Sequence, residues 1–133
     1  MKMNPVIHFE MSADNQNRAA EFYAKVFGWQ YKKTGAEMGN YVVVSTTESD
    51  EKGPKKPGAI NGGLYDRSQV KPDQQYPSVV IHVEDYKEHM EKIEKEGGKI
   101  LGEPMEIPGV GWYVSFRDTE GNRVGILQPI PMN

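Results

Sequence analysis

The sequence predicts an α+β fold built from two tandem βαβββ modules, and two observations support this fold. A strand pattern at residues 6–11 leads into a helix that ends at Phe27-Gly28, and the same order returns about 70 residues later, from Val79 to a helix that ends at Gly97-Gly98. Stretches rich in β-branched and aromatic residues, which are typical of strands, follow each helix. Neither module alone buries much apolar surface. We therefore expect one curved, mixed eight-stranded sheet around a cleft, with both helices outside.

The first module begins with an alternating strand. Ile7, Phe9 and Met11 share one face, and Val6, His8 and Glu10 share the other. Asp14 or Asn15 is placed to cap the following helix. The apolar stripe expected to pack this helix on the sheet comprises Ala19, Phe22, Tyr23, Val26 and Phe27. Further strands are predicted over residues 29–34, 41–47 and 59–66, with residues 48–58 as a solvated loop.

The second module repeats this order. A strand is predicted over residues 78–84. Asp85 and Glu88 then have the spacing of a capping box, which marks the start of a helix. The apolar face of this helix carries Tyr86, Met90 and Ile93. Strands are then predicted over residues 99–107, 112–117 and 122–128. We expect one domain over residues 1–133, with modules at 4–66 and 78–129 joined by a polar linker at 67–77.

Composition narrows the possible partners and the compartment. The 133 residues carry a net charge of -3 with both signs interspersed, so we expect neither nucleic acid nor an anionic membrane as a partner. No cysteine is present, which excludes disulfides, thiolate nucleophiles and Cys-ligated zinc. The sequence contains neither a signal-peptide pattern nor an apolar stretch of membrane-spanning length. We expect a cytoplasmic protein.

Several motifs together resemble one known family. They are His8, the helix end from Phe22-Tyr23 to Gly28-Trp29, the Gly97-Gly98 stop, Pro108-Gly109-Val110-Gly111-Trp112, and the run from Phe116 to Asn122. In these motifs the chain resembles the vicinal oxygen chelate superfamily, which contains glyoxalases, bleomycin resistance proteins and extradiol dioxygenases. It is most similar to the small two-module type related to lactoylglutathione lyase. The resemblance implies the fold described above and a homodimer, but one specific activity does not follow from it.

The resemblance also implies a metal site with four ligands, one from the first and one from the last strand of each module. His8 matches the first of these positions. Asn61 or a neighbouring glycine falls at the second, Ser78 at the third, and Gly125 at the position where glutamate is usual. Catalytic zinc sites normally have three protein ligands. We therefore expect no metal cofactor and no metal-dependent lactoylglutathione lyase activity; the alternative is a divalent metal at His8, helped by Glu10 or His82.

A small-molecule site in the cleft is the leading functional hypothesis. The candidate ligand-binding residues are His8, Glu10, Tyr41, Asn61, Ser78, His82, Trp112 and Leu127. The first hypothesis is a binding protein for a small apolar or aromatic metabolite or antibiotic. The second is a lyase, isomerase or dioxygenase acting on a small carbonyl compound, either through a metal or through acid-base work by His8 and Glu10. The third is a non-catalytic dimeric interaction module. Whether the protein is an enzyme is left open, since His8 and Glu10 also fit purely structural roles.

Overall fold

The computed structural model describes residues 2–131 and confirms the α+β class, with two βαβββ modules and an eight-stranded mixed sheet. By their contacts the residues group into two compact units. The first unit contains residues 8–77, and the second contains residues 2–7 together with 78–131. Neither of the two α-helices, which have 12 and 10 residues, is long and apolar enough to span a membrane, and the same holds for every helix in the described part of the chain.

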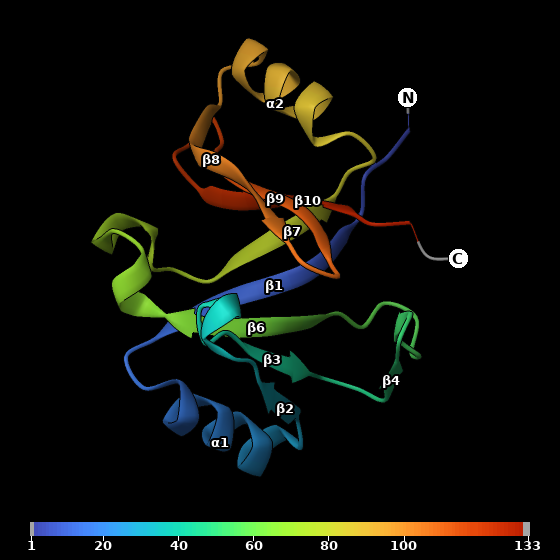
Figure 1. The fold of residues 1–133 in the computed structure, drawn as a ribbon, viewed down its shortest axis with the longest axis vertical. Coiled ribbons are helices and arrows are strands. Elements are labelled where there is room, and N and C mark those ends of the chain that lie inside the picture. The colour runs from blue at the N-terminus through green and yellow to red at the C-terminus, as the bar shows by residue number, and fades with distance from the viewer. Residues whose placement is uncertain (1, 132–133) are drawn as a thin grey trace. The chain divides into compact units, whose positions relative to one another are not determined.

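The first unit packs one helix on a four-stranded part of the sheet (Figure 1). Its main elements are β1 (Val6–Ala13), α1 (Gln16–Phe27), β2 (Gln30–Lys33), β3 (Val42–Ser45) and β6 (Asn61–Asp66), and its strand order is β2-β3-β6-β1. β1 runs parallel to β6, whereas the other neighbouring pairs are antiparallel. A short 3-10 turn at Ala36–Met38 joins β2 to β3, and two more follow β6 at Arg67–Gln69 and Pro72–Gln74. The predicted loop at 48–58 contains a small hairpin of β4 (Ser49–Asp50) and β5 (Gly53–Pro54).

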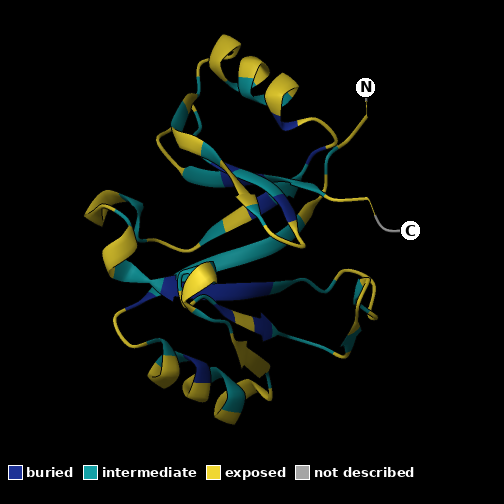
Figure 2. Ribbon diagram, viewed as in Figure 1, coloured by how far each residue is buried: buried dark blue, intermediate teal, exposed yellow. Residues whose placement is uncertain are grey.

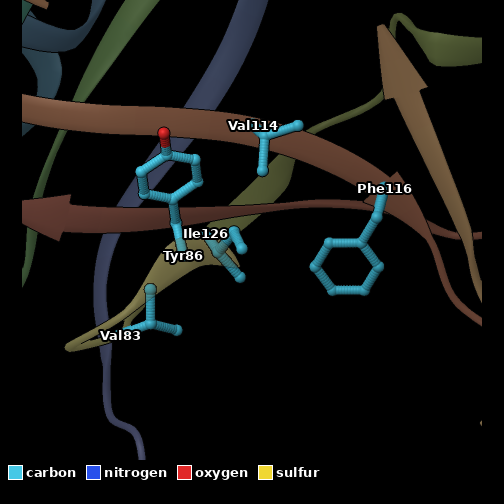
Figure 3. Packing of buried hydrophobic residues seen from close by; sticks show 5 residues of the cluster. All are labelled: Val83, Tyr86, Val114, Phe116 and Ile126. Carbon is cyan, nitrogen blue, oxygen red and sulfur yellow. The ribbon is translucent and has the colours of Figure 1, made fainter. Parts of the chain in front are cut away.

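The second unit repeats this arrangement with β7 (Ser78–His82), α2 (Tyr86–Lys95), β8 (Lys99–Ile107), β9 (Gly111–Arg117) and β10 (Arg123–Pro129). The strand order is β7-β10-β9-β8, with β7 parallel to β10. Its core lies between α2 and the sheet. Figure 3 shows this cluster, in which Tyr86 from the start of α2 packs with Val83, Val114, Phe116 and Ile126. The Tyr86 ring also stacks on Trp112, with ring centroids 5.2 Å apart.

Both helices begin at caps that the sequence predicts, and α1 ends at its predicted glycine, whereas α2 ends at Lys95 with Glu96 rather than a glycine as its C-cap. Asn15, one of the two predicted caps, accepts a hydrogen bond from the Arg18 amide at 2.9 Å. Asp85 accepts from the amides of Lys87 and Glu88 in the first turn of α2. These caps satisfy amides that have no partner inside the helix. Gly28 ends α1 with φ at 73°, a left-handed conformation that glycine adopts without strain.

The packing face of α1 differs from the predicted stripe. Ala20 is 2% exposed, whereas Phe22, Val26 and Phe27 are 56%, 55% and 62% exposed. Small side chains therefore occupy the line of closest contact with the sheet, which places the bulkier Phe22 and Val26 on the flank of the helix. Figure 2 shows most of α1 as exposed or intermediate. Of the predicted stripe, Ala19 packs against the buried cluster of Ala20, Val42, Val44 and Leu64.

Candidate functional site

The face of β1 that points away from α1 carries the two catalytic candidates. Phe9 and Met11 pack against the core cluster under α1, so the alternation of the strand places His8 and Glu10 on the opposite face. In the register with β6, His8 lies beside Asn61 and Glu10 lies beside Gly63. Both candidates are partly buried. The sequence pattern thus correctly predicted that these two side chains share a face.

A chain of hydrogen bonds joins His8, Tyr41 and Glu10. The Tyr41 hydroxyl donates to Glu10 Oε2 at 3.2 Å, and it lies 2.9 Å from His8 Nε2. A phenol has one proton to donate. Since that proton goes to Glu10, the hydroxyl oxygen accepts from His8 Nε2, which therefore carries the imidazole proton. In this tautomer Nδ1 of His8 is a hydrogen-bond acceptor.

The surroundings of His8 favour its neutral form. Burial lowers the pKa of His8 below its ordinary value of 6.5, because a charged imidazolium loses solvation there. The charge of Glu10 acts in the opposite direction and offsets part of this effect. A neutral imidazole has both a donor and an acceptor nitrogen, so His8 links the phenol on one side and is able to accept a proton on the other.

Gly63 makes room for Tyr41. A Cβ atom built on Gly63 would lie 2.0 Å from the ring and hydroxyl atoms of Tyr41, far inside van der Waals contact. The Tyr41 ring therefore lies directly over the backbone of β6 at Gly63. This position brings its hydroxyl to Glu10, the neighbour of Gly63 on β1. A glycine at residue 63 is thus a condition for the hydrogen-bonded chain.

The second unit contains the same tyrosine-over-glycine arrangement. A Cβ atom on Gly125 would lie 2.6 Å from the ring of Tyr113. Gly125 of β10 pairs with Ser115 of β9, two residues after Tyr113, and Gly63 of β6 pairs with Val43 of β3, two residues after Tyr41. The two contacts occupy matching positions in the two modules. In both, a phenol ring fills the space that a longer side chain on the last strand would need.

The predicted residue Asn61 is engaged in holding a loop. Its Oδ1 accepts from the Thr46 amide at 2.8 Å, and its Nδ2 donates to Ser49 Oγ at 2.9 Å. These bonds tie β6 to the segment that follows β3 and to the β4-β5 hairpin. Both ends of the amide are thereby occupied, which favours a structural role over ligand binding.

In the second unit, three of the predicted residues occupy β7 and β10, and the fourth lies in the core. His82 pairs with Leu127, and Val80 pairs with Gly125. The alternation of β7 places Ser78 and His82 on one face of that strand. Ser78 Oγ is buried and has no hydrogen-bond partner among residues 2–131. Trp112 stacks on Tyr86 within the core under α2, so its ring is engaged in packing.

The side chains do not fit the metal site that the family resemblance implies. Among residues 2–131, no three His, Cys, Asp or Glu side chains gather closely enough to hold an ion. His8 Nε2 is already engaged with Tyr41, and the Tyr41 and Tyr113 rings occupy the space over Gly63 and Gly125. A carboxylate ligand therefore has no room at either glycine.

The role of Tyr41 as the link between His8 and Glu10 was not predicted from the sequence. Tyr41 was expected only as a ligand-binding side chain. Residues 8 and 41 meet because β6 lies between β1 and β3, and this neighbourhood depends on strand order rather than on local pattern. The available signal was Gly63, a glycine inside a strand, which often marks the close approach of another group.

Comparison with known proteins points to one family. Residues 6–126 match the sequence profile of the Glyoxalase/Bleomycin resistance protein/Dioxygenase superfamily. A glyoxylase-like domain-containing protein from Didymella fabae is 30% identical over 118 residues, covering 85% of this chain and 84% of that protein. The putative glyoxylase CFP32 from Mycobacterium bovis is 26% identical over 126 residues, covering 92% of this chain but only 43% of CFP32. The chain thus corresponds to less than half of CFP32.

A solved structure shows the same fold. Methylmalonyl-CoA epimerase from Mycobacterium tuberculosis superimposes with a TM-score of 0.64 over 95% of this chain and 88% of the epimerase, at 13% sequence identity. At this identity the similarity establishes the shared fold alone.

We predict that Gly63→Ala destabilises the protein by about 1–3 kcal/mol, because the new methyl group displaces the Tyr41 ring. In a Tyr41→Ala background the same change is expected to be neutral or slightly stabilising, since the obstacle is gone. Urea unfolding of the two single variants and the double variant measures this coupling. Additive effects of the two changes would contradict the tyrosine-over-glycine contact.

The lowered pKa of His8 predicts a specific pH dependence. As the pH falls, the unfolded chain binds a proton at His8 near its ordinary pKa of 6.5. The folded protein binds this proton only at a lower pH. The free energy of unfolding therefore falls as the pH drops below about 6.5, and His8 has no such effect above that value. Measured by urea unfolding between about pH 8 and pH 5, the decrease in the free energy of unfolding should be smaller for His8→Gln than for the unsubstituted protein. His89→Gln, at a partly exposed site on α2, serves as the control and should show the same decrease as the unsubstituted protein.

Proposed function

Because the chain belongs to the Glyoxalase/Bleomycin resistance protein/Dioxygenase superfamily, we propose that it binds a small apolar or aromatic molecule on the face of β1 and β6 that carries His8 and Glu10. The observation that supports this proposal is the hydrogen-bonded chain from His8 through Tyr41 to Glu10. Polar groups held in fixed positions beside apolar surface are typical of small-molecule sites.

The chemistry of this face suggests the kind of ligand. The Tyr41 ring and Val43, which is 38% exposed, provide apolar surface beside Gly63. His8 Nδ1, an acceptor in the tautomer that Tyr41 imposes, suits a hydroxyl or amide donor on the ligand. A ring or short apolar body with one hydrogen-bonding group would complement these features.

The proposed site works without the metal ion of the family. This part of the proposal rests on the ring-filled positions over Gly63 and Gly125 and on the engagement of His8 with Tyr41. We further propose that the protein acts in the cytoplasm as a homodimer and binds no nucleic acid. The third hypothesis, a pure interaction module, predicts that no small molecule binds at His8.

A second candidate function is acid-base catalysis, which the Glu10-Tyr41-His8 chain favours. A carboxylate held by a phenol suits a reaction in which a proton leaves a carbon next to a carbonyl group, and an epimerase is among the solved structures with this fold. Glu10 would take that proton, and the electron pair of the C–H bond would move into an enolate. Return of a proton to either face of the carbon then completes an isomerisation or epimerisation. The Tyr41 hydroxyl would hold Glu10 in place.

The binding proposal predicts a ligand-dependent rise in thermal stability. In a thermal-shift screen of small carbonyl compounds, thiol adducts and antibiotics, a true ligand at 100 times its dissociation constant adds about 2.7 kcal/mol. His8→Ala and Tyr41→Phe should weaken the binding of any such compound, whereas His89→Ala should not. Binding should survive treatment with a chelator. A chelator-sensitive ligand, or stoichiometric metal lost in His8→Ala, would contradict the metal-free site.

The catalytic alternative predicts exchange of a carbon-bound proton. With methylmalonyl-CoA in heavy water as the probe, deuterium should enter the carbon next to the thioester carbonyl, as measured by proton NMR. Glu10→Gln should abolish this exchange, because an amide does not serve as the base, and His89→Gln should leave it unchanged. Equal exchange rates with and without Glu10 would exclude Glu10 as the base.

A further inference from the structure

A recess in the first unit lies apart from the His8 face. It has a volume of about 420 Å³ and is bounded by the end of β1, the first half of α1, and residues Leu64 and Arg67. Met11 lines it and belongs to the side of β1 that packs against the core under α1, opposite to His8 and Glu10. The recess is therefore distinct from the proposed site.

Part of the lining of this recess is apolar. Met11, Ala19, Phe22, Tyr23 and Leu64 contribute to its lining. Phe22 is 56% exposed, so much of its ring contacts water. An apolar group placed in the recess would remove part of this ring from water, which is favourable.

One arginine at the rim is fixed by the fold. The Arg67 guanidinium donates from Nε to Ser12 Oγ at 3.0 Å, from Nη2 to the Ser12 carbonyl at 3.3 Å, and from Nη1 to Asp14 at 3.1 Å. These bonds join the turn after β6 to the end of β1. Asp14 balances the charge of Arg67, so this pair shapes the rim without adding net charge.

The other arginine at the rim, Arg18, has no carboxylate partner. None of the ion pairs among residues 2–131 includes its side chain. With Arg67 balanced by Asp14, Arg18 leaves the rim with one uncompensated positive charge. This local excess stands out in a chain with a net charge of -3. Guanidinium groups suit carboxylates and phosphates, which they bind through paired hydrogen bonds.

We propose that this recess binds a small molecule with an apolar body and one carboxylate or phosphate group. The anionic group pairs with Arg18 at the rim, and the apolar body lies against Phe22 and Met11. Binding here does not depend on the proposed function at His8, because the two sites share no side chain.

Amide NMR titrations with benzoate and phenyl phosphate test the proposal. We expect saturable shift changes for the amides of residues 11–19 and 64–67 with at least one of these anions, and much weaker changes with the neutral benzyl alcohol. Arg18→Gln should weaken binding about tenfold or more, as expected for loss of a charge-assisted hydrogen bond. Arg18→Lys should retain part of the affinity because it keeps the charge.

Two matched variants show whether binding is specific to this recess. Lys25 lies on the same helix and pairs with Glu21, so Lys25→Gln removes a cation that is not part of the recess. This variant should leave binding unchanged. His8→Ala should also leave it unchanged, so failure of the His8 site and failure of this site are distinguishable. Absence of saturable shifts with both anions at millimolar concentration would overturn the proposal. Equal binding of both anions by Arg18→Gln and the unsubstituted protein would do the same.

Discussion

The close approach of the Tyr41 ring to the backbone of β6 is the contact on which the candidate site depends. An ordinary Cβ atom at residue 63 would lie 2.0 Å from the ring, so this approach requires glycine. With the ring in place, its hydroxyl reaches both Glu10 and His8 and fixes the imidazole tautomer. The ring also fills space that a metal-binding side chain would need. One packing contact thus determines both the hydrogen-bonding chemistry of this face and its poor fit to a metal.

Much of the fold was predictable because its signals are local. Asn15 and Asp85 cap their helices, and Gly28 ends α1 in a left-handed conformation, as the residue types indicate. β8 has the predicted bounds, 99–107. The apolar face of α1 was predicted less well, because periodicity identifies a wide arc of apolar side chains but not the line of closest contact. Ala19 and Ala20 make the closest contact of α1 with the sheet, and Phe22 and Val26 are exposed.

The candidate site was predictable only in part, for a different reason. Strand alternation was sufficient to place His8 and Glu10 together, since it involves neighbours in sequence. The hydrogen bond of Tyr41 to Glu10 and the bonds of Asn61 to Thr46 and Ser49 depend on which strands and loops lie side by side. Likewise, alternation along β9 separates Trp112 from Tyr113, but only the position of α2 shows that Trp112 lies on the core side.

The matching tyrosine-over-glycine contacts in the two modules also constrain how this sequence is able to diverge. A single exchange of Gly63 or Gly125 for glutamate would force the carboxylate into an aromatic ring, at a cost to stability. The tyrosine over each glycine must be replaced by a smaller residue, or its ring must move, before an acidic side chain fits at the glycine. A carboxylate at either glycine therefore requires a second substitution at the tyrosine of the same module, and the order of the two substitutions determines how strongly the intermediate variant is destabilised.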